Sequence, residues 1–181
     1  MKTSSIFVKD RLEVWLTDLE SHVFTNEKEK NLFYPIFELD QLYFEPAWSN
    51  ERWFSLLGTA RKFLLLEIKE NSKLRGFLLA EVNEGSSFVE IHKVLIVPDC
   101  RGRGFGKLLV SLLKEEVIKR SEESIILQVA EDNQKARGLY QHLGFQKIRT
   151  LDSYYASGKN ALELIWKNDL AMCRQAPLQA Q

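Results

Sequence analysis

Three glycines alternate with basic and aromatic residues in the middle of the chain, at Arg101-Gly102-Arg103-Gly104-Phe105-Gly106-Lys107. The apolar run Val94-Leu95-Ile96-Val97 precedes them and an amphipathic stretch follows. This order predicts a strand, a tight turn and the start of a helix. Glycines let the backbone approach a ligand closely, and the free N–H groups at a helix start favour negative charge. The stretch therefore predicts a site for a phosphate-bearing ligand.

Two common glycine motifs do not fit this stretch. In the dinucleotide-binding pattern the third glycine would fall on Lys107 or on Leu109. In the phosphate-binding loop of nucleoside triphosphatases, Gly106-Lys107 would be followed by Ser or Thr, whereas Leu108 stands there. The pattern that fits is Arg101-x-x-Gly104-x-Gly106, which resembles the acetyl-CoA pyrophosphate loop of the Gcn5-related N-acetyltransferases (the GNAT family).

A second segment carries the same resemblance. Asn133-Gln134-Lys135-Ala136-Arg137-Gly138-Leu139-Tyr140, followed by Gly144-Phe145, resembles the family's pattern N-x-x-A-x-x-L-Y-x-x-x-G-F. Both motifs occur in the family's order, and the resemblance covers about residues 60–168. Glu45-Pro46-Ala47-Trp48-Ser49 and Ser153-Tyr154-Tyr155 are most similar to the RimI type, the bacterial N-terminal alanine acetyltransferases of a ribosomal protein.

The resemblance implies how acetyl-CoA would be held. Pantetheine would pair with the strand edge at Val94, Leu95 and Ile96, and the amides of the loop would take the pyrophosphate. Arg101 and Arg103 would add positive charge, or are solvated surface cations. Asn133 would contact the pantetheine arm, cap a helix, or do both. The residues expected to bind the cofactor are Val94, Leu95, Ile96, Arg101, Gly102, Arg103, Gly104, Phe105, Gly106, Lys107 and Asn133.

Tyr140 is the expected catalytic acid. An amine that attacks the thioester expels a thiolate, which needs a proton, and a phenol of pKa ~10 can supply one while it stays protonated at neutral pH. A buried aromatic residue that only packs its helix is the alternative interpretation.

The catalytic base is harder to place. The RimI type has a glutamate at the position of Gln128, and glutamine cannot take a proton at neutral pH. Glu90 is the expected catalytic replacement, because Phe88-Val89-Glu90-Ile91 resembles the catalytic-glutamate strand of the family's histone acetyltransferases. His92, two residues further on the same strand face, is a second candidate. Both could instead be ordinary solvent-facing positions.

The free energy needed to deprotonate the acceptor amine bears on which kind of amine the enzyme uses. At pH 7 this costs roughly 1–1.5 kcal/mol for an α-amine of pKa near 8, against ~4.5 kcal/mol for lysine. Loss of the usual glutamate therefore favours an N-terminal amine. The acceptor groove is expected between the loops at 43–48 and 153–159, where Tyr154 and Tyr155 could stack along a peptide.

The amino-acid composition of the chain argues against several classes of function. The 181 residues carry a formal net charge of zero, which argues against a general nucleic-acid or membrane binder. Cys100 and Cys173 give neither a disulfide framework nor metal-ligand spacing, and no stretch looks like a secretion signal or a membrane span. We expect a cytoplasmic protein with no bound metal and no direct nucleic-acid contact, whose oligomeric state stays open.

Periodicity predicts the elements that position these residues. Their order predicts an α/β (α+β) fold with a mixed sheet. The resemblance implies that this central sheet is mostly antiparallel, splayed at the acetyl-CoA site and flanked by helices on both faces. We expect an N-terminal extension at 1–27, an N-acetyltransferase domain at 28–168 and a tail at 169–181. Within the extension, 8–19 has helix-like spacing and 22–25 could form a short strand. Helices are expected at 28–43, 49–57, 104–120 and 133–143, and strands at 62–69, 74–82, 88–97, 124–130, 145–150 and 160–166.

The sequence thus predicts an acetyl-CoA-dependent N-acetyltransferase that transfers acetyl directly to a protein N-terminus, with a ribosomal protein as a candidate acceptor. Two alternatives stay open: an enzyme that acetylates a small-molecule amine, and a catalytically weak acyl-CoA-binding protein. Gln128 is the residue that keeps the second alternative open.

Overall fold

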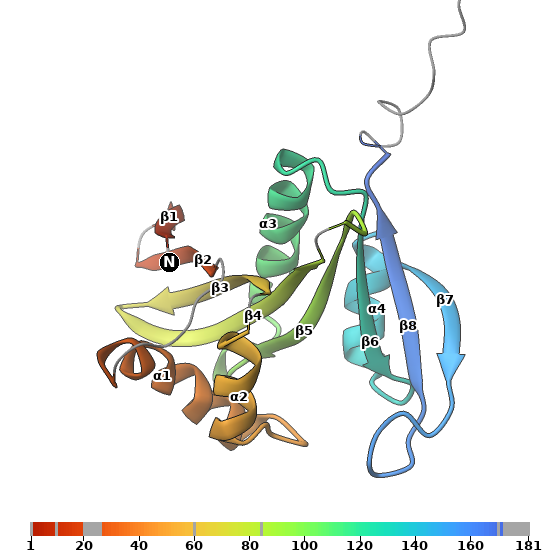
Figure 1. Cartoon of the computed structure of the whole chain (residues 1–181), viewed down its shortest axis with the longest axis horizontal. Helices are drawn as coiled ribbons and strands as arrows, with labels where there is room; N and C mark the ends of the chain where they lie inside the picture. The colour runs from red at the N-terminus through yellow and green to blue at the C-terminus, as the bar shows by residue number, and fades with distance from the viewer. Residues whose placement is uncertain are drawn as a thin grey trace, which may run out of the picture. The chain divides into compact units, whose positions relative to one another are not determined.

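The fold is taken from a computed structural model that describes residues 2–9, 11–19, 27–59, 61–83, 85–169 and 171. These residues form eight strands and four α-helices (Figure 1). The expected strand at 22–25, the residue Cys173 and nearly all of the expected tail lie outside the described residues.

The chain divides into two compact units, one formed by 1–82 with 92–110 and the other by 83–91 with 111–181. In the first unit the strands β1 to β4 follow one another, each antiparallel to the last, and β5 comes next in order. In the second, the start of β5 runs parallel to β6, which is antiparallel to β8, and β7 is antiparallel to β8. The expected mixed, mostly antiparallel sheet is confirmed. The strands are β1 (Lys2–Lys9), β2 (Leu12–Leu19), β3 (Lys62–Glu70), β4 (Lys73–Asn83), β5 (Phe88–Ile96), β6 (Ser124–Ala130), β7 (Gln146–Leu151) and β8 (Ala161–Lys167).

The helix expected over 8–19 is wrong, because Leu12–Leu19 is strand β2. It pairs in register with β3 along its whole length, from Leu12 opposite Glu70 to Leu19 opposite Phe63. The apolar residues fit a helical period, but Val14 and Leu16 also fit strand alternation and both are buried. The exposed edge of β3 supplies hydrogen-bond partners that local periodicity does not contain.

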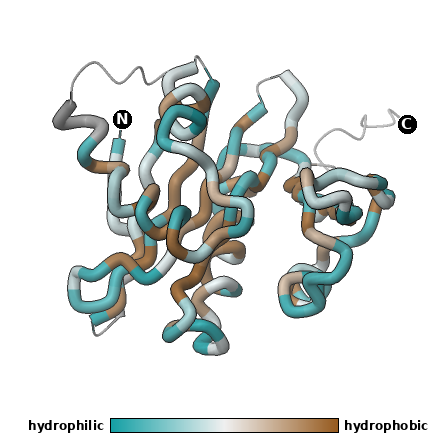
Figure 2. Tube along the Cα trace, turned by 90° about the horizontal axis from the view of Figure 1, so that it is seen from below, coloured by the Kyte–Doolittle hydropathy of each residue, from teal (hydrophilic) through white to brown (hydrophobic). Residues whose placement is uncertain are grey.

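Two helices cover the first unit's sheet. In Figure 1, α1 (Glu27–Tyr43) and α2 (Asn50–Leu57) lie beneath β3 and β4. The α2 helix begins as expected at Ser49, whose hydroxyl accepts from the Arg52 amide at 3.2 Å. Trp53 stacks on Phe37 with ring centroids 5.1 Å apart and meets Phe77 of β4 edge-on. Buried apolar residues of β3 and β4 form the core of this unit. Figure 2 colours the hydrophobic segments of the chain brown.

The second unit holds most of α3 (Phe105–Lys119) and all of α4 (Gln134–His142). Lys114 of α3 donates to the Leu143 carbonyl at 3.0 Å, just past the end of α4, and lies over the Trp166 ring of β8. Lys114 therefore connects α3 to the end of α4 and to β8. The described ladder between β5 and β6 joins Phe88–Ile91 to Ser124–Leu127, and the expected splay beyond it stays a prediction. The proposed domain boundaries at 28 and 168 also stay predictions.

Candidate functional site

The glycine turn has the backbone that the sequence predicts. Gly102 and Gly104 have φ of 77° and 85°, in the left-handed region that favours glycine. Leu108 N donates to Gly104 O at 2.9 Å, which is the first hydrogen bond of α3. The amides of Phe105 and Gly106 therefore have no acceptor within the helix. Free amides at a helix start favour a negatively charged ligand, and anion binding at this turn stays a prediction.

The arginines of this turn are held by internal contacts. Arg103 binds Glu70 of β3 through two hydrogen bonds, with Nη2 2.5 Å from Oε1 and Nη1 3.2 Å from Oε2. This hydrogen bonding lowers the pKa of Glu70 and raises that of Arg103. Arg101 Nε donates to the Ile96 carbonyl at 3.0 Å. Both side chains brace the turn against the strands, and Glu70 partly neutralises its positive charge.

The end of β5 leads directly into the turn. Leu95 is buried, whereas Val94 and Ile96 are half-buried on the other face of the strand. Val97 N donates to the Arg75 carbonyl of β4 at 3.0 Å. The backbones are so close that a Cβ on Gly76 would lie 2.5 Å from the Leu95 carbonyl oxygen. This close packing fixes where the turn begins.

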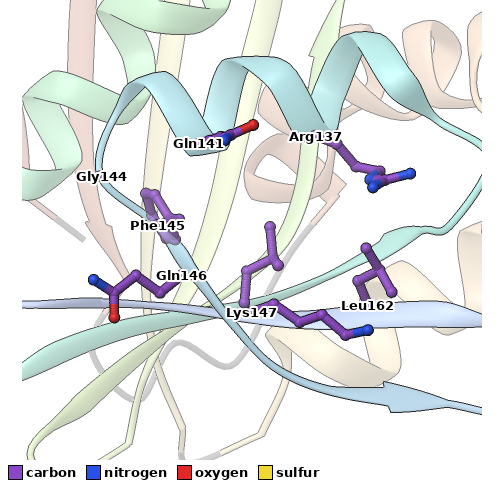
Figure 3. A pocket seen from close by; sticks show the side chains of 8 residues that line it. Arg137, Gln141, Gly144, Phe145, Gln146, Lys147 and Leu162 are labelled. Atoms are coloured by element: carbon purple, nitrogen blue, oxygen red, sulfur yellow. The ribbon is translucent and has the colours of Figure 1, made fainter.

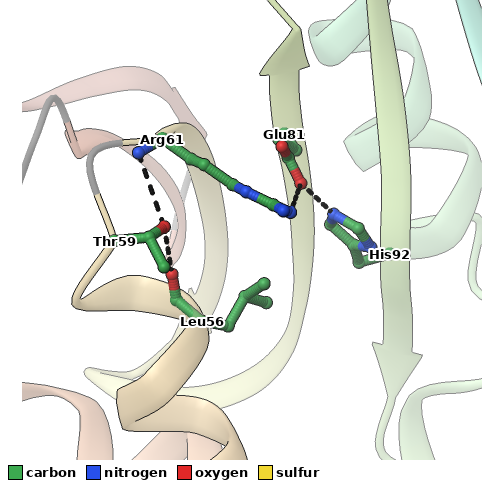
Figure 4. Close-up of polar contacts among 5 residues, drawn as sticks. All are labelled: Leu56, Thr59, Arg61, Glu81 and His92. Atoms are coloured by element: carbon green, nitrogen blue, oxygen red, sulfur yellow. Dashed lines mark hydrogen bonds and ion pairs between the residues drawn. The ribbon is translucent and has the colours of Figure 1, made fainter.

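A buried carboxylate lies beside His92, and the sequence analysis missed it. Glu81 of β4 is 5% exposed, and its Oε2 lies 2.9 Å from His92 Nε2 and 3.3 Å from Arg61 Nη1 (Figure 4). Glu81 lies at the end of an otherwise buried apolar run, Phe77–Val82, which was the available signal. The second candidate base is therefore oriented by a carboxylate.

A second buried pair ties the loop after α1 to β5. Lys93 Nζ lies 2.5 Å from Asp40 Oδ1, and the other Asp40 oxygen accepts from Trp48 N at 3.0 Å and Trp53 Nε1 at 2.9 Å. Lys93 Nζ also lies over the rings of Phe44 and Trp48, at 3.9 and 4.4 Å. This cluster fixes the loop at 43–48, which was expected to line an acceptor groove.

The expected acid and the expected asparagine lie on α4. Tyr140 is 7% exposed and packs edge-on against Phe145, with ring centroids 5.5 Å apart. Burial, with a smaller contribution from Tyr155, raises the pKa of Tyr140. Asn133 caps the helix by accepting from the Ala136 amide at 3.1 Å, so the capping role is present, and its contact with pantetheine stays a prediction.

Gln128, which stands where the RimI type has a glutamate, contacts a different carboxylate, that of Glu163. Gln128, Glu163 and Arg149 lie opposite one another across β6, β8 and β7. Gln128 Nε2 donates to Glu163 at 3.4 Å, and Arg149 Nε donates to the other Glu163 oxygen at 2.7 Å. Glu90 lies opposite Ile126 and so on the same sheet face as Gln128. It forms no hydrogen bond through its side chain within the described ranges.

The second unit also has an open pocket of about 520 Å³ between α4 and strands β7 and β8 (Figure 3). Leu162 and Phe145 form its apolar part, and Arg137 and Lys147 carry its positive charge. Arg137 already donates to the Glu131 carbonyl at 2.7 Å. Leu162 and Glu163 point to opposite faces of β8, so this pocket lies on the face away from Gln128.

The remaining observations concern the tyrosine pair of the expected acceptor groove, metal binding, membrane spans and Cys100. Tyr154 and Tyr155 meet edge-on at 5.1 Å, and their role in an acceptor groove stays a prediction. Among the described residues there is no cluster of side chains suited to a metal ion. Within the same part of the chain, no helix is both long and apolar enough to cross a membrane. Cys100 is buried and is not in a disulfide.

Comparison with known proteins decides the family. The profile of the acetyltransferase (GNAT) family matches residues 31–145, which include the glycine turn, Asn133 and Tyr140. The chain belongs to the GNAT family. Members of this family are acetyltransferases, and the fold and the two motifs agree with that assignment.

Several acetyltransferases are similar to this chain. A [ribosomal protein bS18]-alanine N-acetyltransferase of Haemophilus influenzae is 29% identical over 127 residues, covering 68% of this chain and 81% of the relative. A mycothiol acetyltransferase of Rhodococcus jostii is 30% identical over 108 residues, covering 58% of this chain and 34% of the relative. The crystal structure of the ribosomal-protein-S18-alanine N-acetyltransferase from Escherichia coli shares the fold, with a TM-score of 0.68 and 21% identity over 84% of this chain and 93% of that one.

Proposed function

We propose that the protein transfers an acetyl group from acetyl-CoA to the α-amino group of a protein N-terminus in the cytoplasm. The similarity to bS18-alanine N-acetyltransferases supports this choice of acceptor, because the match spans most of the relative's length. A ribosomal protein with an N-terminal alanine is thus the first acceptor to test.

The glycine turn fits the phosphate groups of acetyl-CoA. Its amides point out from the start of a 15-residue helix, and a Cβ added to Gly102 or Gly104 would meet nothing within 4 Å. The requirement at these two glycines is therefore conformational, and space remains for a ligand next to the backbone. In the proposal the amides of residues 102–107 bind pyrophosphate, Val94–Ile96 bind pantetheine, and Arg101, Arg103 and Asn133 assist.

Tyr140 serves as the acid in this proposal. Its burial keeps the phenol protonated throughout the neutral range, which is the state that a proton donor to a thiolate requires. Acetyl passes directly to the amine, without a covalent enzyme intermediate. The proton acceptor is Glu90 or His92, and their surroundings differ: a buried carboxylate orients His92, whereas Glu90 has no such partner among the described residues.

A peptide screen tests the proposed function. Purified protein is incubated with acetyl-CoA and synthetic N-terminal peptides, including the alanine-first bS18 sequence, and products are identified by mass spectrometry. We expect an added acetyl group on the α-amine of at least one peptide, and none on the same peptide with a blocked N-terminus. Acetylation confined to internal lysines would contradict the proposal.

A small-molecule amine is the second candidate acceptor. The mycothiol acetyltransferase of R. jostii supports it, because its matched third is 30% identical to this chain over 108 residues. Turnover of a small amine with no turnover of any N-terminal peptide would favour this alternative. Tight acetyl-CoA binding without transfer to either would favour an acyl-CoA-binding protein, for which Gln128→Glu is the informative variant.

A further inference from the structure

The Glu81–His92 contact fixes one tautomer of the imidazole. An ionised carboxylate only accepts hydrogen bonds, and Glu81 also accepts from Arg61 at 3.3 Å. A neutral His92 must then carry its proton on Nε2 and keep a lone pair on Nδ1. Nδ1 forms no hydrogen bond with any of the residues that the structure describes.

Aromatic rings hold this imidazole in place. The ring centroid of Phe63 of β3 lies 6.1 Å from that of His92, and the ring centroid of Trp48 lies 6.2 Å from it. Trp48 is itself fixed through its amide by the buried Asp40. His92 keeps 19% of its side chain exposed, so the ring is oriented yet reachable. Such a combination of a carboxylate, an oriented imidazole and a free ring nitrogen is typical of general-base sites.

We propose that Nδ1 of His92 is the general base of the reaction and that Glu81 is its positioning residue. The inference rests on the acetyl transfer proposed above. Glu81 and Arg61 are the charged groups that face the ring from neighbouring segments, and Glu90 shares its strand face. Glu90 is not oriented by any described partner, which is why the structure favours His92.

The proton balance is as follows. Nδ1 of His92 takes one proton from the α-ammonium group, and the neutral nitrogen forms a bond to the acetyl carbon as the carbon–sulfur bond breaks. The thiolate sulfur receives a proton from Tyr140. The acetylated nitrogen sheds its second proton, which restores the proton of Tyr140, and His92 releases its own to water. The net products are the acetylated amine, CoA and one proton.

The basicity of imidazole is better matched to an N-terminal amine than to a lysine side chain. In model compounds the pKa of imidazole is about 6.5, that of an α-amine about 8 and that of a lysine about 10.4. Proton transfer to imidazole is thus unfavourable by roughly 30-fold for an N-terminal amine and by roughly 10⁴-fold for lysine. The base supports an N-terminal acceptor.

Four variants test the role of His92 when the wild type acetylates an N-terminal peptide. His92→Gln, which can still donate to Glu81, should lower kcat by about 10²- to 10⁴-fold and leave the Kd of CoA within twofold. His142→Gln, the matched control on the exposed end of α4, should keep kcat. Added imidazole should partly restore kcat to His92→Ala. A kcat within threefold of wild type in His92→Gln would overturn the proposal, as would loss of kcat in Glu90→Gln alone.

A measurement without turnover tests the same geometry. The ¹⁵N shifts of the His92 ring in the wild type at pH 8 should show a proton on Nε2 only, and Glu81→Gln should give a mixture of tautomers. A proton on Nδ1 in the wild type would overturn the proposal even if the enzyme is active. If the wild type acetylates no N-terminal peptide, the proposed function fails and the base assignment fails with it, whereas an active enzyme with an unaffected His92→Gln refutes the base alone.

Discussion

Lys93 of β5 and Asp40 of α1 form a salt bridge of 2.5 Å in the core, with side chains 1% and 0% exposed. The carboxylate also accepts from Trp48 and Trp53, so one aspartate connects α1, the following loop, α2 and β5. Such a pair costs desolvation energy, and here its aspartate also binds the backbone of Trp48 and so holds the loop at 43–48.

Removal of the aspartate charge should destabilise the protein strongly. Asp40→Asn leaves the Lys93 ammonium buried without its counterion, for which we expect a loss of about 3–5 kcal/mol in the free energy of unfolding. Urea unfolding measures it, with Glu38→Gln on the exposed face of the same helix as control. The double variant Asp40→Asn/Lys93→Met should recover part of the loss. A loss below about 1 kcal/mol in Asp40→Asn would show that the pair is not coupled as described.

The same lysine should make stability depend on pH. Burial, opposed by Asp40, lowers the pKa of Lys93 from 10.5 to about 8. Between these values the unfolded chain binds more protons than the folded one, so the free energy of unfolding should rise as pH increases from about 8 to about 10. Above about pH 10, tyrosine ionisation in the unfolded chain opposes the rise. Denaturant unfolding of wild type and Lys93→Met over this window tests it, and equal slopes would contradict it.

Tyr140→Phe should separate chemistry from binding. The variant keeps the ring that packs on Phe145 and loses only the hydroxyl. We expect kcat to fall by about 10²- to 10⁴-fold, with the KM for acetyl-CoA nearly unchanged. Tyr34→Phe on α1 is the matched control. An unchanged kcat would remove Tyr140 as the acid.

Glu70 should weaken cofactor binding by holding Arg103. Glu70→Gln removes a negative charge next to the glycine turn and frees the guanidinium, so the Kd of CoA should fall by about two- to fivefold at low salt. Arg103→Ala should raise the Kd of CoA. Titration calorimetry at two salt concentrations measures both, with Glu115→Gln on the exposed side of α3 as control. Tighter binding that does not depend on salt would argue against this electrostatic cause.

Substitution of two glycines by alanine should change the free energy of unfolding in opposite directions. At Gly76 a Cβ would lie 2.5 Å from the Leu95 carbonyl oxygen, so Gly76→Ala should lower the free energy of unfolding by about 1–3 kcal/mol. At Gly138, inside α4, a Cβ would meet nothing within 4 Å, so Gly138→Ala should raise it by about 0.5–1 kcal/mol. Thermal unfolding gives both values. A neutral Gly76→Ala would mean that β4 and β5 can move apart without cost.

The sequence by itself determined the elements from α1 to β8 and the glycine turn. Their signals are local: the Ser49 and Asn133 caps, the alternation of β5 and the glycines with positive φ are all encoded within a few residues. Both motifs of the family are also local, which is why the resemblance identified the family without a structure.

Tertiary structure alone decided what depends on neighbouring strands. Leu12–Leu19 became a strand because the edge of β3 was available, and Gln128 met Glu163 through strand register. Lys93 falls on the buried face of β5 with Val89 and Leu95, and its partner Asp40 lies 53 positions away in the chain. The pairing of Glu81 with His92 is of the same kind. Contacts between distant residues depend on strand register and helix packing, and no local pattern contains them.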